Sequence, residues 1–180
     1  MKNIIFLILV SLTFISCSSI KTPAGEVDVI IPCQGSEFRT NKNYFRAFGS
    51  SVSNNPNGAI QDAEDMASGQ LALEIERKIK VVTERYSENI GDGMKGNFTS
   101  ESERLIRQVS RQTLNKTKII CSKTTKIKNS GMYRHYTSIE LAVEDIVKDY
   151  SDQIEDNTKS TIRINRDKFR AIFNEEIDKQ

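Results

Sequence analysis

The chain has 180 residues, which suits one domain of ordinary size plus short appendages. It carries 26 basic and 24 acidic side chains mixed along its length, so the net charge of +2 gives no electrostatic case for nucleic-acid binding, which normally needs a clustered basic face. Tryptophan is absent and aromatic residues make up only 7%, which also argues against a base-stacking surface.

Residues 1–16 have the pattern of an export signal. Lys2 supplies a positive charge, and an almost unbroken apolar run extends from Ile4 to Ile15. This run is shorter than the ~20 apolar residues that a membrane-spanning helix needs. It ends in Phe14-Ile15-Ser16-Cys17, which resembles the lipobox of bacterial lipoproteins.

The lipobox resemblance implies that Cys17 becomes the first residue of the mature chain and carries the lipid. An ordinary secretory signal with an incidental cysteine is the alternative. We favour lipidation because Cys17 falls where the apolar run stops and polar sequence begins. The folded part would then lie in water beside a membrane, held there by acyl chains.

Residues 18–43 are predicted to begin as a linker and to turn into structure. The composition from Ser18 to Glu26 is typical of a solvated linker. Val27 to Ile31 is expected to form a short strand that Pro32 ends. After a polar loop, Tyr44 to Phe48 predicts another strand.

The stretch that organises the chain is a predicted helix from Asn55 to about Ile90. Asparagine can cap its first N–H groups, and Pro56 suits its first position. A continuous helix would be ~45 Å long, so it is expected either to protrude or to break at the β-branched residues 81–83. Apolar residues at steps of three and four place one side of this helix inward, namely Ala63, Ala67, Leu71, Ile75, Ile79, Val82 and Tyr86.

Residues 91–96 spell G-x-G-x-x-G. In a dinucleotide site this pattern follows a buried strand and opens a helix. Here it follows a predicted helix, so we interpret the glycines as a helix end and a turn.

A second helix is predicted to open at Ser100-Glu101-Ser102-Glu103, which has the capping-box pattern. Its inward side would carry Leu105, Ile106, Val109 and Leu114. Arg104, Arg107 and Arg111 would line another side at helical spacing. The simplest interpretation is a solvated face, and the functional alternative is a patch for an anionic lipid or a partner protein.

The pattern then changes to that of strands. Residues 118–127 and 133–143 flank a turn signal at 128–131, which predicts a β-hairpin. A third helix is predicted around residues 146–154, and Thr161 to Ile164 is expected to add a short strand. The chain should end in an amphipathic helix with Phe169, Ile172, Phe173 and Ile177 on its apolar side.

Two further cysteines, Cys33 and Cys121, lie in or beside predicted strands. Because export would expose them to oxidation, we predict a disulfide, with two separately buried thiols as the alternative. No C-x-x-C pattern or neighbouring histidine suggests a metal centre.

Candidate catalytic groups are few. His135 is the only histidine, and no serine or cysteine motif points to it as a general base. Asp62, Glu64 and Asp65 could suggest a metal, but their place near a helix N-terminus is better explained by the helix dipole. We therefore expect no enzyme activity, no cofactor and no metal.

The order of these elements resembles a known family. A lipobox, the strand Tyr-Phe-Arg-Ala-Phe-Gly, an alanine-rich helix, a second helix and a hairpin containing Ile119-Ile120-Cys121 are similar to the lipoprotein-20 family of bacterial envelope lipoproteins. A more distant likeness is to the N-terminal domain of a flagellar T-ring protein. The resemblance covers roughly residues 27–150 and implies an α+β fold, with a small antiparallel sheet packed on the long helix. It carries over no catalytic or ligand residues.

Together these features divide the chain into four parts. Residues 1–16 form the signal, 17–43 the lipidated cysteine, tether and first strand, 44–157 the α+β domain, and 158–180 a strand and the C-terminal helix. We expect a non-catalytic envelope lipoprotein that binds a protein or self-associates. The surfaces expected to do so are the arginine side, the protruding part of the long helix, and Phe169 with Phe173.

Two other functions stay open. A small-ligand or glycan-binding module would need an apolar pocket between helix and sheet, and an enzyme would need polar groups gathered around His135 or the acidic cluster. In bacterial lipoproteins, which this N-terminus resembles, an aspartate after the lipidated cysteine holds some members in the inner membrane. Ser18 stands at that position here, so the resemblance implies the outer membrane with the domain facing the periplasm, and surface display is the alternative.

Overall fold

The computed structural model describes residues 22–88, 95–156, 166–177 and 179. The predicted signal, Cys17, most of the glycine pattern and the predicted strand at Thr161–Ile164 lie outside these described residues. The chain divides into two compact units, Met1–Ile30 and Ile31–Gln180.

The described part of the first unit is extended chain with one turn, in which the Glu26 N–H donates to the Pro23 carbonyl at 3.1 Å. The strand predicted at Val27–Ile31 is absent. Val27, Val29 and Ile30 are 83%, 76% and 93% exposed. A strand needs a neighbouring strand for its backbone groups, and β-propensity alone does not provide one.

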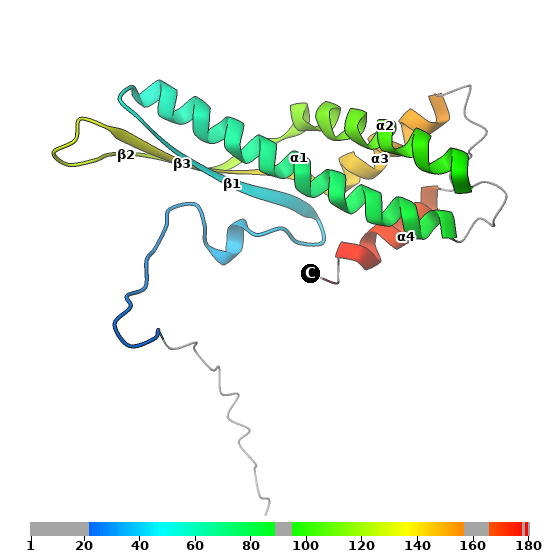
Figure 1. Cartoon of the computed structure of the whole chain (residues 1–180), viewed down its shortest axis with the longest axis horizontal. Helices are drawn as coiled ribbons and strands as arrows, with labels where there is room; N and C mark the ends of the chain where they lie inside the picture. The colour runs from blue at the N-terminus through cyan, green and yellow to red at the C-terminus, as the bar shows by residue number, and fades with distance from the viewer. Residues whose placement is uncertain (1–21, 89–94, 157–165, 178, 180) are drawn as a thin grey trace, which may run out of the picture. The chain divides into compact units, whose positions relative to one another are not determined.

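The second unit contains a three-stranded antiparallel sheet in the order β1-β3-β2 (Figure 1). The strands are β1 (Tyr44–Ser53), β2 (Lys118–Lys126) and β3 (Tyr133–Ala142). The predicted hairpin is confirmed as β2 and β3, with φ angles of +61° at Asn129 and +69° at Gly131 in its turn. Strand β1 pairs along the other edge of β3, so that Phe45 lies opposite Leu141.

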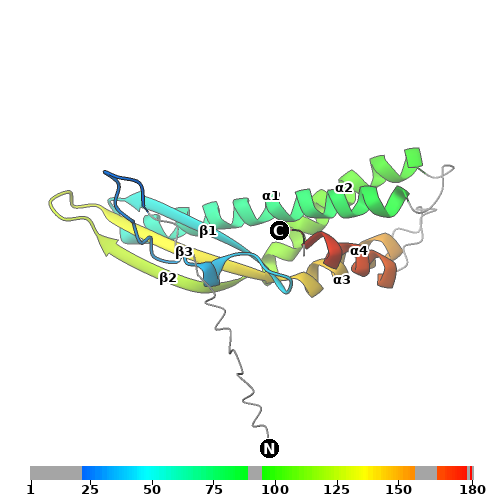
Figure 2. The same cartoon turned by 90° about the horizontal axis from the view of Figure 1, so that it is seen from below.

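The long helix α1 (Pro56–Glu88) lies on one face of the sheet (Figures 1 and 2). The predicted cap is present, because Asn55 Oδ1 accepts from the Asn57 N–H at 2.9 Å. The helix is continuous through Val81–Thr83. Val82 and Thr83 are buried there, and the Thr83 hydroxyl lies 2.9 Å from that of Tyr150. Packing therefore outweighs the weak helix propensity of the β-branched residues.

Three further helices follow: α2 (Lys95–Thr113), α3 (Val143–Asp156) and α4 (Arg166–Ile177) (Figure 2). Helices α2 and α4 pack on α1, and α3 packs on α2 and α4. Helix α2 begins at Lys95, so the Ser100–Glu103 pattern lies inside the helix and does not open it. Two short 3₁₀ helices complete the unit, at Ser36–Phe38 and Leu114–Lys116. Within the described residues, no helix is both long enough and apolar enough to span a membrane.

The size of the buried side chains changes along α1. Ala59, Ala63 and Ala67 are fully buried in its N-terminal half, where the helix packs on the sheet. The C-terminal half instead buries larger side chains, among them Leu71, Ile75, Ile79 and Tyr86. Here α2 and α4 pack beside α1. The predicted α+β class, with a sheet on the long helix and a C-terminal helix, is confirmed.

Candidate functional site

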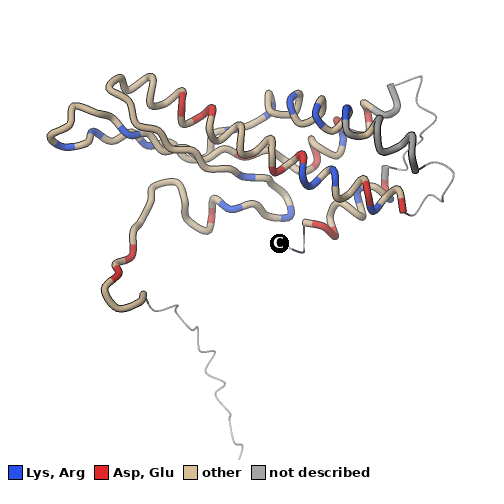
Figure 3. The backbone as a smooth tube through the Cα atoms, in the orientation of Figure 1, with Lys and Arg blue, Asp and Glu red and all other residues tan. Residues whose placement is uncertain are grey.

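The side chains of Arg104, Arg107 and Arg111 on α2 are exposed. Figure 3 shows basic residues recurring along this helix. They occupy positions i, i+3 and i+7, which share one face of an α-helix. The opposite side of α2 buries Leu105, Ile106 and Val109, as predicted. We call the three arginines the basic face of α2.

Two glutamines complete this face. Gln108 and Gln112 line the same surface hollow of about 500 Å³ as the three arginines. Gln153 of α3 lies between the two amides: Gln108 Nε2 donates to Gln153 Oε1 at 3.0 Å, and Gln153 Nε2 donates to Gln112 Oε1 at 2.9 Å. The amide chain holds the floor of the hollow in place. These glutamines are not among the surface residues predicted from the sequence. Their i, i+4 spacing between the arginines nevertheless places them on the same face.

The positive charge of the basic face is not balanced by the described residues. No ion pair joins any of its three guanidinium groups to a described carboxylate, whereas Arg46 pairs with Glu140 at 2.9 Å and Lys116 pairs with Asp149 at 2.7 Å. The nearby Glu76 accepts a hydrogen bond from the Ser110 hydroxyl at 3.0 Å. Three exposed guanidinium forks therefore remain available to an anionic partner, for which their planar geometry is well suited.

The prediction that Phe169 and Phe173 form an interaction surface is wrong. Both side chains are fully buried. The ring of Phe169 stacks on that of Tyr150 at 4.8 Å, and Phe173 lies edge-on to Phe45 at 6.2 Å. The apolar side of α4 packs against α1 and α3, so these phenylalanines belong to the core of the domain.

The predicted cysteine pair is present. The sulfur atoms of Cys33 and Cys121 are 2.10 Å apart and the Cα atoms 5.4 Å apart. The Ser138 hydroxyl also donates to the Cys33 carbonyl at 2.6 Å. The segment before β1 is therefore fastened to both β2 and β3.

Thr40 also links the segment before β1 to the domain, through hydrogen bonds to β1 and α1. Its hydroxyl accepts from the Arg46 N–H at 2.9 Å and donates to Glu74 Oε1 of α1 at 2.9 Å. Burial raises the pKa of Glu74, and the Thr40 hydrogen bond and Lys78 oppose that rise. This link occupies a backbone group at an edge to which another strand could otherwise add. No pattern in the sequence indicated it.

The residues considered for catalysis do not gather into a site. His135 is buried, with Nδ1 2.8 Å from the Thr124 hydroxyl and Nε2 3.4 Å from that of Ser122. Asp62 and Asp65 are exposed on α1. No three potential metal ligands lie together within the described part of the chain. The ring of His135 is thus held by hydroxyls of β2 as a packed polar residue.

The core between α1 and the sheet is packed with side chains. A hollow of about 640 Å³ opens beside it, between α1, the edge of β1 and residues 33–40, and its lining includes the charged residues Arg39, Arg46 and Glu74. Phe45, Leu71 and Ile139, which belong to β1, α1 and β3, are each at most 3% exposed. A ligand-binding module would need an apolar pocket at this place, so its packing does not favour the small-ligand or glycan alternative.

No protein-family model and no curated protein matches this chain.

Proposed function

We propose that this chain is a non-catalytic lipoprotein of the lipoprotein-20 type, anchored by Cys17 at the outer membrane with its domain facing the periplasm. Its folded domain binds an acidic surface of another envelope protein through the basic face of α2. The observation that carries this proposal is a row of three exposed arginines without ion pairs among the described residues, on a floor of hydrogen-bonded amides.

The anchor is supported by the sequence of the first residues. The apolar run from Ile4 stops at Ser16, and Cys17 follows it directly. Each buried CH₂ of an attached acyl chain contributes ~0.8 kcal/mol, so a cysteine carrying several chains would remain on the membrane. The domain then needs to recognise only partners that share this membrane or the space beside it.

An acidic protein surface fits the basic face better than a lipid surface does. The arginines alternate with Gln108 and Gln112, whose amides can exchange hydrogen bonds with a polar protein surface. A guanidinium group binds a carboxylate through two parallel hydrogen bonds, which gives the contact a defined geometry. Membrane-surface helices instead bury a broad apolar side in the lipid, and the apolar side of α2 is buried in the core of the domain.

The anchor can be tested by metabolic labelling with a fatty acid. Wild type is expected to incorporate label and to fractionate with the outer membrane, whereas Cys17→Ala should incorporate none, because the acceptor sulfur is lost. Ser18→Ala is the matched control and should behave as wild type. Label that persists in Cys17→Ala, or that is absent from wild type, would refute lipidation at this residue.

The basic face can be tested with a photo-crosslinking residue at Gln108 in envelope membranes. We expect a protein adduct that falls at least about tenfold when Arg104, Arg107 and Arg111 are all changed to Glu, because close charge pairs across the interface become repulsive. Added salt should also weaken the adduct.

The control for this experiment changes Lys118, Lys123 and Lys128 to Glu. These exposed residues of β2 and the adjoining turn give the same change in net charge away from α2, so the adduct should persist. An adduct that survives the arginine changes would contradict the proposed face. Crosslinking to lipid alone would show that the face meets the membrane instead.

A further inference from the structure

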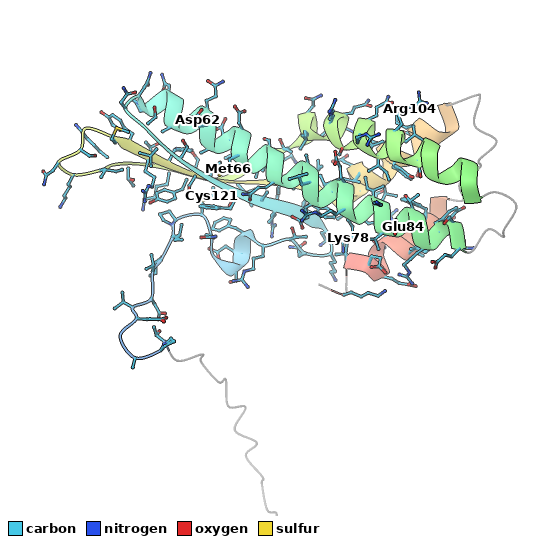
Figure 4. The ribbon with its side chains drawn as sticks, in the orientation of Figure 1. Asp62, Met66, Lys78, Glu84, Arg104 and Cys121 are labelled. Carbon is cyan, nitrogen blue, oxygen red and sulfur yellow. A yellow bond between two sulfur atoms is a disulfide. The ribbon has the colours of Figure 1, made fainter. Side chains whose placement is uncertain are left out.

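A second surface lies along one exposed side of α1. Asp62, Met66, Gly69, Leu73, Arg77 and Lys80 are all exposed. Met66 is 47% exposed and Leu73 is 53% exposed, and the two side chains lie two turns apart on the same side of the helix. Figure 4 shows Asp62 and Met66 in the N-terminal half of this helix. We call these six residues the outer face of α1.

Gly69, in the middle of the outer face, has no role in the fold of this chain. A Cβ atom placed on it would have no neighbour within 4 Å. Glycine is a poor residue for a helix interior, so alanine would stabilise the helix at this position. The missing side chain instead leaves room for another helix to approach the backbone of α1 closely.

The acidic and basic residues of the outer face lie in opposite halves of α1. Asp62 lies toward the N-terminus of α1, where its Oδ2 accepts from the Ser51 hydroxyl of β1 at 3.5 Å. Arg77 and Lys80 lie toward the C-terminus of the helix. Neither cation forms an ion pair with a described carboxylate, and Glu76, one turn before Lys80, accepts from Ser110. A second helix that runs antiparallel would bring its own Asp62 to this basic end.

Helix geometry makes this match specific. Asp62 and Lys80 are 18 residues apart, or about five full turns, so the two side chains lie on the same side of α1. A twofold axis beside residue 71 places Asp62 opposite Lys80 of a second copy. The same axis places Gly69 opposite Leu73, and each contact occurs twice, as twofold symmetry requires.

We propose that the outer face of α1 binds the same face of a second copy of this chain, with the two helices antiparallel. Leu73 of each copy covers Gly69 of the other, and Asp62 pairs with Lys80 at both ends. Beside this contact, a hollow of about 580 Å³ lined by Leu73, Arg77 and Val81 of α1 and by Glu176 of α4 leaves room for the second helix. The inference does not depend on the basic face of α2 or on Cys17.

The proposal can be tested by crosslinking the full-length chain through single introduced cysteines. Gln70→Cys should give a covalent dimer with a short bis-maleimide, because residue 70 is exposed next to the axis and its substitution leaves Gly69 unchanged. Glu84→Cys is the matched control, since it is exposed on the same helix but its two copies would be ~39 Å apart. It should give no dimer under the same conditions.

Charge reversal then tests the alignment. In the Gln70→Cys background, Asp62→Lys and Lys80→Asp should each lower the dimer yield roughly tenfold, because two attractive pairs become repulsive. The double variant should restore the yield, while circular dichroism shows that every variant is folded. No dimer at residue 70 above the Glu84→Cys control, a crosslink to a different protein, or failure of the double variant to restore the yield would each overturn the proposal.

Discussion

At the scale of single residues, Gly49 shows how closely α1 approaches the sheet. A Cβ atom on Gly49 would lie 2.0 Å from the carbonyl oxygen of Ala63 and 2.8 Å from the nitrogen of Ala67. Both atoms belong to the helix backbone and cannot move aside as a side chain could. The glycine in β1 and the alanines in α1 therefore act together to set the distance between the two elements.

We expect Gly49→Ala to lower the free energy of unfolding by about 1–3 kcal/mol, because the added methyl group forces α1 away from β1. The matched control is Gly69→Ala, which adds the same methyl group where nothing lies within 4 Å. It should raise the stability by about 0.5–1 kcal/mol. Urea unfolding at low protein concentration measures both changes. Equal effects of the two substitutions would contradict this account of the α1–β1 contact.

Tyr150 illustrates how a single polar group is accommodated in the core. Its side chain is fully buried, and burial raises the pKa of its hydroxyl to about 12, although the Thr83 hydrogen bond opposes this rise. The hydroxyl therefore remains protonated at neutral pH and stays hydrogen-bonded to α1. This contact joins α3 to the β-branched part of α1 at which a break was expected.

At the scale of elements, the spacing of apolar residues along α1 explains its two environments. Each step of four residues advances the buried side by ~40° around the helix axis. The five steps from Ala59 to Ile79 therefore turn it by roughly half a revolution. One end of the helix can thus face the sheet while the other end faces α2 and α4.

Helix α4 shows the limit of an amphipathic pattern. The pattern correctly predicted a helix with Phe169, Ile172, Phe173 and Ile177 on one side. It did not indicate whether that side meets this domain or another protein, because either would bury the same apolar area. The position of α4 beside α1 and α3 decides the question in favour of this domain.

At the scale of the whole second unit, the Cys33–Cys121 disulfide connects segments that are 88 residues apart in sequence. It joins the segment before β1 to β2, which is the strand farthest from β1 in the sheet. The loop it closes includes β1, α1 and α2. The unfolded chain is therefore strongly restricted by this link.

Replacing both cysteines with serine, in Cys33→Ser/Cys121→Ser, should lower the free energy of unfolding by ~4 kcal/mol in the chain-entropy model. Helix content by circular dichroism should stay close to that of wild type, because no helix depends on the disulfide for its hydrogen bonds. Wild type treated with a reductant is the control and should lose similar stability. An unchanged urea midpoint in both cases would argue against a disulfide in the folded protein.

The sequence by itself determined the local elements. Helix α1 with its cap, the hairpin and the last two helices follow from periodicity, capping and turn residues, each of which acts within a few neighbouring positions. The predicted export signal and the lipobox resemblance also rest on the sequence alone.

Only the tertiary structure decided which surfaces remain free. It buried Phe169 and Phe173, left Val27 to Ile30 without a strand partner, and kept α1 continuous through Thr83. These outcomes depend on contacts between residues far apart in the chain, and a short sequence pattern contains no information about what will cover it. The same long-range packing exposes the arginines of α2 and the outer face of α1, the two surfaces that we propose for binding.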